Sequence, residues 1–140
     1  MFKANMVAPC GLDCNICSQA LIENNPCQGC NGSDDHKPEF CAMRCGIILC
    51  EKRRKNGYKY CDECSDYPCD DVMEKENRYT TQYPHIESPL ENLRMIRENG
   101  MDAFLEYERQ HFTCPICGSP FSVHNRTCHT CGNIIETKPR

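Results

Sequence analysis

The chain has 140 residues, a formal net charge of −4 and 15 cysteines. Only 23 residues are Val, Ile, Leu or Phe, too few to bury an apolar surface that offsets a backbone entropy cost of ~1–2 kcal/mol per residue. The composition therefore excludes a fold held by a large apolar core. The negative charge argues against a general binder of phosphate backbones.

Metal binding explains the cysteines better than disulfide bonding does. Residues 1–15 lack the apolar core of a secretory signal peptide, and no apolar run reaches the ~18 residues that a transmembrane helix needs. We therefore expect a cytoplasmic protein with no membrane partner, in which thiols stay reduced and Cys-x-x-Cys pairs bind metal. The odd number of cysteines also disfavours complete disulfide pairing.

The distribution of the cysteines divides the chain into three parts. Eleven cysteines lie within residues 10–69 and four within 114–131, with none between these ranges. We predict a Cys-rich metal-binding module at 1–78, a helical connector at 79–112 and a zinc ribbon at 113–140. The expected fold class is small α+β, stabilised by metal.

Three helices are expected in the Cys-rich module. Asp13 can N-cap a helix that runs to about residue 24. A second helix is expected over about 40–55, ending near Gly57, because glycine favours the C-terminal cap. A third begins near Pro68, because proline is favoured at the first helical position.

The connector predicts a helical hairpin. Ser88 and Glu91 form a capping box with a proline between them, which predicts a helix over 89–98. Asp102 can cap the next helix, over 103–111. The hairpin contains no ligand or catalytic motif.

The C-terminal segment carries the most specific motif, CPICG at 114–118 and CHTCG at 128–132. Each half predicts a tight turn that directs two sulfurs to one point, followed by a glycine that tolerates positive φ. Short strands are expected at 121–125 and 133–137. Four thiolates leave no coordination position for water, so we expect structural zinc on Cys114, Cys117, Cys128 and Cys131. Iron in a rubredoxin-like site is the alternative.

The N-terminal cysteines predict further metal sites, but their spacing does not decide which cysteines bind the same ion. The expected ligands are Cys10, Cys14, Cys17, Cys27, Cys30, Cys41, Cys45, Cys61, Cys64 and Cys69. One arrangement joins the pairs at 14/17 and 27/30, and a second joins 41/45 to 61/64. Cys50 is expected to be a buried thiol and His36 a loop residue. Together with the ribbon, this predicts two to four Zn²⁺ ions per chain.

An iron–sulfur cluster within residues 10–69 is the alternative interpretation. Cys10, Cys14 and Cys17 have the spacing that radical-SAM enzymes use for a four-iron cluster. Those enzymes also need most of a (β/α) barrel of about 200 residues, and the chain has no βαβ repeat. The alternative is therefore a redox or cluster-carrying protein that uses these three thiolates and one more.

The cysteine motifs resemble a known family. The runs APCGLDCNIC at 8–17, CQGC at 27–30 and CDEC at 61–64 followed by DYPC at 66–69 are similar to domain-of-unknown-function family 3795, a group of small bacterial and archaeal proteins. The connector and the ribbon resemble the longer members of this family. The basic insertion after Cys50 departs from its pattern. The resemblance implies zinc binding and carries no established activity.

The sequence favours a non-catalytic role. It lacks a phosphate-binding loop, a His-Glu-x-x-His motif and a nucleophile elbow, which leans against an enzyme without settling the question. We predict a zinc-binding interaction module whose partner is another protein. Nucleic-acid binding through the basic run at 52–55, close to Tyr58 and Tyr60, is a further hypothesis, although these cations also suit a solvated helix end.

Overall fold

A computed structural model describes residues 2–82, 87–122, 127–128 and 130–134. Within these residues the elements are short 3-10 turns and α-helices. The turns are η1 (Ala4–Met6), η2 (Cys14–Ile16), η3 (Asp34–His36) and η4 (Cys61–Glu63). The helices are α1 (Glu39–Met43), α2 (Glu51–Asn56), α3 (Asp70–Gln82), α4 (Pro89–Asn99) and α5 (Met101–His111).

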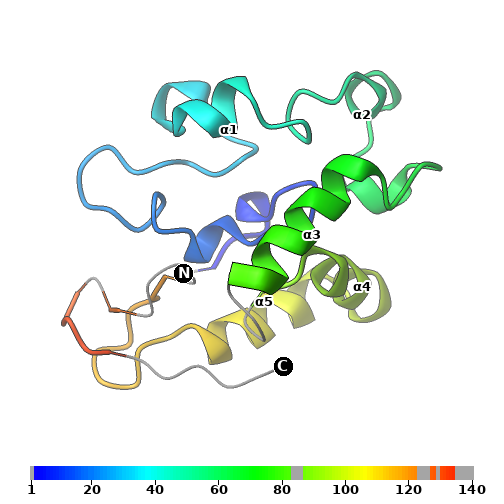
Figure 1. The fold of residues 1–140 in the computed structure, drawn as a ribbon. Coiled ribbons are helices and arrows are strands. Elements are labelled where there is room, and N and C mark those ends of the chain that lie inside the picture. The colour runs from blue at the N-terminus through cyan, green and yellow to red at the C-terminus, as the bar shows by residue number, and fades with distance from the viewer. Residues whose placement is uncertain (1, 83–86, 123–126, 129, 135–140) are drawn as a thin grey trace.

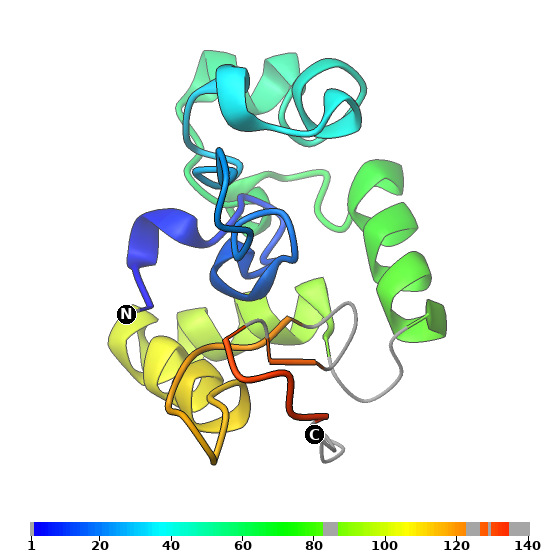
Figure 2. The same ribbon diagram turned by 90° about the vertical axis from the view of Figure 1, so that its left-hand side faces the viewer.

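The N-terminal segment lies at the centre of the molecule. Figures 1 and 2 show α1 and α2 on one side of it, the α4–α5 hairpin on the other, and α3 along its flank. Two small clusters of buried side chains hold these parts together. One contains Ala8, Cys10, Cys14, Cys45, Ile47, Ile48 and Val72. The other contains Ile16, Phe112, Cys114, Phe121 and Cys128. Residues 8–16 contribute to both.

The expected α+β class is wrong for the part of the chain that the structure describes. Its β-structure is limited to isolated bridges, which join Val7 to Asp13, Thr113 to Pro120 and Thr127 to Ile134. Pro120 has no N–H with which to extend the pairing between the two segments. In the opposite segment, the N–H of Phe112 already bonds the Glu108 carbonyl at the end of α5. The expected strands at 121–125 and 133–137 lie partly outside the described residues.

The helix expected from Asp13 to about residue 24 is also wrong. Asp13 does cap a turn, since its carboxylate accepts a hydrogen bond from the backbone N–H of Asn15 at 2.9 Å. The turn ends at Ile16, and Cys17 is extended. The Asn15 side chain is bound to the backbone of Lys3 by two hydrogen bonds of 3.0 Å. These long-range contacts replace the continuing helix.

The single helix expected over 40–55 is divided into α1 and α2. The intervening residues bury Ile47 and Ile48 in the core. A Cβ atom built on Gly46 would lie 2.5 Å from Oδ1 of Asp71, so the chain passes close to an α3 side chain at this point. Arg53 donates hydrogen bonds of 3.1 Å to the carbonyls of both isoleucines. The expected stop at Gly57 is confirmed, with φ of +66°.

The helices at 70–111 agree closely with expectation. Ser88 caps α4 by accepting a hydrogen bond from the N–H of Glu91 at 3.2 Å. α3 begins at Asp70, two residues after Pro68. α5 begins at Met101, just before the expected cap at Asp102.

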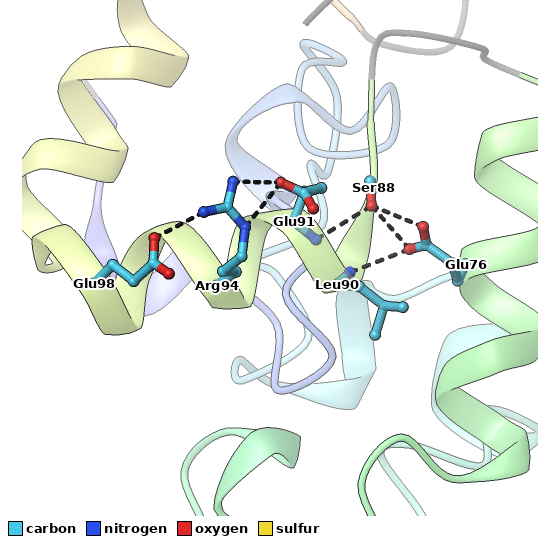
Figure 3. A network of polar contacts seen from close by, with 6 residues as sticks. All are labelled: Glu76, Ser88, Leu90, Glu91, Arg94 and Glu98. Carbon is cyan, nitrogen blue, oxygen red and sulfur yellow. Dashed lines mark hydrogen bonds and ion pairs between the residues drawn. The ribbon is translucent and has the colours of Figure 1, made fainter.

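A carboxylate from α3 fixes the start of α4 (Figure 3). Glu76 accepts hydrogen bonds from the Ser88 hydroxyl at 2.8 and 3.0 Å and from the Leu90 N–H at 3.1 Å. A negative charge is favourable there, because the first N–H groups of a helix have no partner within the helix. Farther along α4, Arg94 pairs with Glu91 and Glu98 at the surface. Glu76 therefore joins two helices, whereas the Arg94 pairs stay within one.

Gly11 joins the N-terminal segment to α4. Its φ is +100°, and an added Cβ would lie 2.5 Å from the carbonyl oxygen of Pro89. Close by, the buried side chain of Asn92 donates a hydrogen bond of 2.9 Å to the carbonyl of Gly11. No residue with a side chain fits this contact without displacing α4.

We expect Gly11→Ala to destabilise the protein more than Gly100→Ala. Both glycines have positive φ, which costs an alanine about 1–3 kcal/mol, but only Gly11 has atoms within 4 Å of the added Cβ. The overpacking should cost a further ~1–3 kcal/mol. Urea unfolding of the two variants measures the difference, and equal losses would contradict the close approach.

We expect Glu76→Ala to lower the free energy of unfolding by about 1–3 kcal/mol, because it leaves the buried Ser88 hydroxyl and the Leu90 N–H without their acceptor. Glu98→Ala removes an exposed carboxylate of the same network and should change stability by less than about 1 kcal/mol. Thermal unfolding of both variants makes the comparison, and equal effects would count against the cap.

Candidate metal sites

The four C-terminal cysteines converge on one point. The sulfurs of Cys114, Cys117, Cys128 and Cys131 all lie within 4.8 Å of one another. Cys114 and Cys131 are 3.7 Å apart, and Cys117 and Cys128 are 3.4 Å apart. Tetrahedral zinc with Zn–S bonds of ~2.3 Å places its sulfurs ~3.8 Å apart. The group therefore has the dimensions that a single bound metal ion requires.

The two halves of this site repeat the same turn. Gly118 and Gly132 have φ of +78° and +76°, and their N–H groups bond the carbonyls of Cys114 and Cys128 at 2.9 and 2.8 Å. The N–H groups of these two cysteines in turn bond Ser119 and Asn133 at 2.8 and 2.9 Å. Local backbone geometry thus places each pair of sulfurs, which is why the sequence alone could predict it.

Backbone N–H groups also favour thiolates in the ribbon. The N–H of Ser119, followed by its hydroxyl and the Cys128 thiol, lowers the pKa of Cys117 to about 6. The N–H of Cys117 lowers the pKa of Cys114. The thiolate is the form that binds a metal, so two of the four ligands are prepared for binding.

The ribbon is anchored through its inner cysteines. Cys114 and Cys128 are buried with Phe112, Phe121 and Ile16, while Cys117 and Cys131 are exposed. The two phenylalanine rings have centroids 5.5 Å apart. An ion at this site would therefore be held on one side by the core and would face solvent on the other.

Six of the N-terminal cysteines line a second, larger site. A cavity of about 120 Å³ lies between the N-terminal segment, α1 and α3. Its cysteines are Cys10, Cys14, Cys17, Cys30, Cys41 and Cys45. The sulfurs of Cys14 and Cys30 are 3.6 Å apart, which matches one contact of the predicted 14/17 and 27/30 set. The predicted grouping of 41/45 with 61/64 is not the arrangement around this cavity, because Cys61 and Cys64 are outside its lining.

The remaining candidate ligands are not part of the cavity lining. Cys61 is an electrostatic neighbour of Cys10, which lines the cavity, and also of Cys69, Cys50 and Cys64. Cys50 is half-buried rather than buried and precedes α2. Cys27 is half-buried and interacts electrostatically with Cys17. His36 contacts the side chain of Asn25.

Burial favours the protonated form of several N-terminal thiols when no metal is bound. It raises the pKa of Cys17, raises that of Cys41 to about 11 and raises that of Cys61 to about 12. Cys30 differs: a hydrogen bond from the Cys14 thiol, assisted by Lys37 and Lys75, lowers its pKa to about 7. Cys30 is therefore the thiolate with which metal binding at this cavity would begin.

Sequence reasoning missed the part that Lys75 plays in this site. Lys75 is 7% exposed, lines the cavity and places its Nζ 4.5 Å from the centre of the Phe40 ring. Val72 is fully buried one helical turn earlier, on the same face of α3. Lys75 follows the apolar Val72 by three residues, a spacing that places both on one face of a helix. This was the signal in the sequence that the lysine faces inwards.

The basic run at 52–55 is largely engaged within the chain. Lys52 pairs with Asp66 at 2.8 Å, Arg53 binds backbone carbonyls and Lys55 lies 4.0 Å from Glu51. These contacts reduce the positive charge available to a phosphate backbone. Nucleic-acid binding stays an untested hypothesis with little support.

The comparisons with known proteins bear on the N-terminal half. Residues 6–74 match the family model described as "Protein of unknown function (DUF3795)". The match confirms the resemblance of the cysteine motifs over this range; the connector and the ribbon lie beyond it. No curated protein and no solved structure matches the chain. Among the described residues, no helix has the length and apolar character to cross a membrane.

We expect zinc binding at the ribbon to strengthen as pH rises through neutrality. The Asn133 N–H lowers the pKa of Cys131, but the neighbouring thiols of Cys114, Cys117 and Cys128 outweigh it and raise this pKa to about 12. Zinc must displace that proton, so binding releases protons and low pH opposes it. Competition with a chromophoric chelator at several pH values measures the zinc affinity of wild type and of Cys117→Ser. The difference between the two proteins gives the affinity of the ribbon, and a difference that did not change with pH would contradict this prediction.

Proposed function

We propose that the protein is a non-catalytic zinc-binding module that presents a surface to another protein. The four converging thiols of the ribbon carry this proposal. Four thiolates suit zinc or iron, and they fill a tetrahedral shell without leaving a position for substrate or water. Such a site contributes folding free energy rather than catalysis, which a chain with so few apolar residues needs.

The distribution of cysteines supports more than one ion. The ribbon accounts for four of the fifteen cysteines, and six others surround a single cavity. We therefore propose two to four Zn²⁺ ions per chain. This proposal includes a cytoplasmic location, because reduced thiols are required.

The proposed contact surface lies on the ribbon. Ile116 is 72% exposed inside the first turn, and Ile134 is 79% exposed just after the second. Exposed isoleucines are costly in water, and a metal-bound turn would hold them in fixed positions. This combination supports an interface in which both side chains enter apolar pockets of a protein partner.

Removing one ribbon ligand tests the metal. We expect Cys117→Ser to contain about one zinc ion fewer than wild type, and the loss of binding free energy of ~10–16 kcal/mol to disorder the ribbon. Elemental analysis gives the metal content, and the NMR amide signals of Gly118 and Gly132 report order. Cys50→Ser, outside the predicted ligand set, is the control. If the amide signals of Gly118 and Gly132 did not move after complete metal removal, a structural role for the ribbon metal would be refuted.

Photo-crosslinking tests the surface. We expect a photoreactive amino acid at position 116 to give a discrete protein adduct in cells, and the same group at exposed Asn99 to give none. Replacing Ile134 with Ser should reduce the adduct while leaving the zinc content unchanged. Equal labelling from both positions would count against an interface on the ribbon.

A further inference from the structure

The cysteines of the N-terminal cavity are arranged differently from those of the ribbon. In the ribbon, four sulfurs lie within 4.8 Å of one another. Among the described residues, no three of the six cavity cysteines meet that condition, although Cys14 and Cys30 approach to 3.6 Å. A single ion needs all its ligand sulfurs at the closer spacing. Each zinc of a thiolate-bridged cluster has the same need, whereas in an iron–sulfur cluster each thiolate binds a different iron and can lie farther from the others.

Cys30 occupies the middle of this arrangement. Besides its contact with Cys14, it is an electrostatic neighbour of Cys10, Cys17 and Cys41. A cluster bound through Cys30 would therefore lie within reach of these other thiolates.

The charge around the cavity favours an anionic occupant. Lys75 is buried, and its electrostatic neighbour Glu74 pairs with Arg78 instead. The two carboxylates that line the cavity, Asp13 and Glu87, accept hydrogen bonds from Asn15 and Asn92 instead. A buried cation requires a compensating negative charge, and metal–thiolate centres carry one.

We propose that this cavity holds a polynuclear metal–thiolate cluster, with Lys75 as its cationic neighbour. The ligands would be drawn from Cys10, Cys14, Cys17, Cys30, Cys41 and Cys45. The metals would be iron ions bridged by inorganic sulfide. This proposal does not depend on the ribbon zinc or on a protein partner, but if it holds, the cavity cysteines do not bind the further zinc ions of the proposed function.

Metal analysis of the untagged full-length chain, purified without oxygen, tests the proposal. We expect Cys30→Ser to lose two or more metal ions together, whereas Cys64→Ser, outside the cavity lining, loses one at most. Inorganic sulfide equal to the iron content identifies an iron–sulfur cluster. Zinc without sulfide in the wild-type protein would overturn the proposal.

A single ion lost from Cys30→Ser, with no sulfide in the wild-type protein, would overturn the proposal in favour of a mononuclear site. Because wild-type protein supplies the sulfide data, the result stands even where a variant folds poorly.

Replacing Lys75 tests the charge argument. We expect Lys75→Met to weaken metal retention against a chelator by about 10–100-fold, the usual effect of losing a group next to the ligands, and Lys75→Arg to restore most of it. Lys59→Met removes an exposed lysine and should have no effect. Equal retention in Lys75→Met and wild type would remove Lys75 from the site.

Discussion

The close contact between Gly11 and the first turn of α4 holds the two halves of this protein together. Because Gly11 has no side chain, the N-terminal segment can lie directly against Pro89, and Asn92 then bonds its carbonyl. On one side of this contact the segment lines the cysteine cavity, and on the other it packs against the ribbon. A chain with so little apolar surface depends on such short, specific contacts.

Local signals in the sequence predicted those features that local geometry determines. The Ser88 cap, the stop at Gly57 and the paired turns of the ribbon are each defined within a few residues. Long-range contacts determine the rest. The sequence does not reveal that Asp71 approaches Gly46 and divides the helix expected over 40–55, or that Lys3 binds Asn15.

The same distinction applies to the candidate sites. The spacing of the ribbon cysteines was sufficient to predict their convergence, because each pair lies within one turn. The six cavity cysteines come from the N-terminal segment, from α1 and from the segments on either side of α1, and only the packing of these parts groups them. Lys75 belongs to a third element, α3. No local spacing rule could have joined it to the cysteines.

Cys14 and Ile16 stand two residues apart in one turn, η2, yet they face different candidate sites. Cys14 lines the cavity, while Ile16 packs against the inner cysteines of the ribbon. An ion that ordered the ribbon would restrict Ile16 and, through this short turn, would act on the position of Cys14. The free energy of such linkage is reciprocal: whatever factor the ribbon metal applied to metal affinity at the cavity, metal in the cavity would apply to the ribbon.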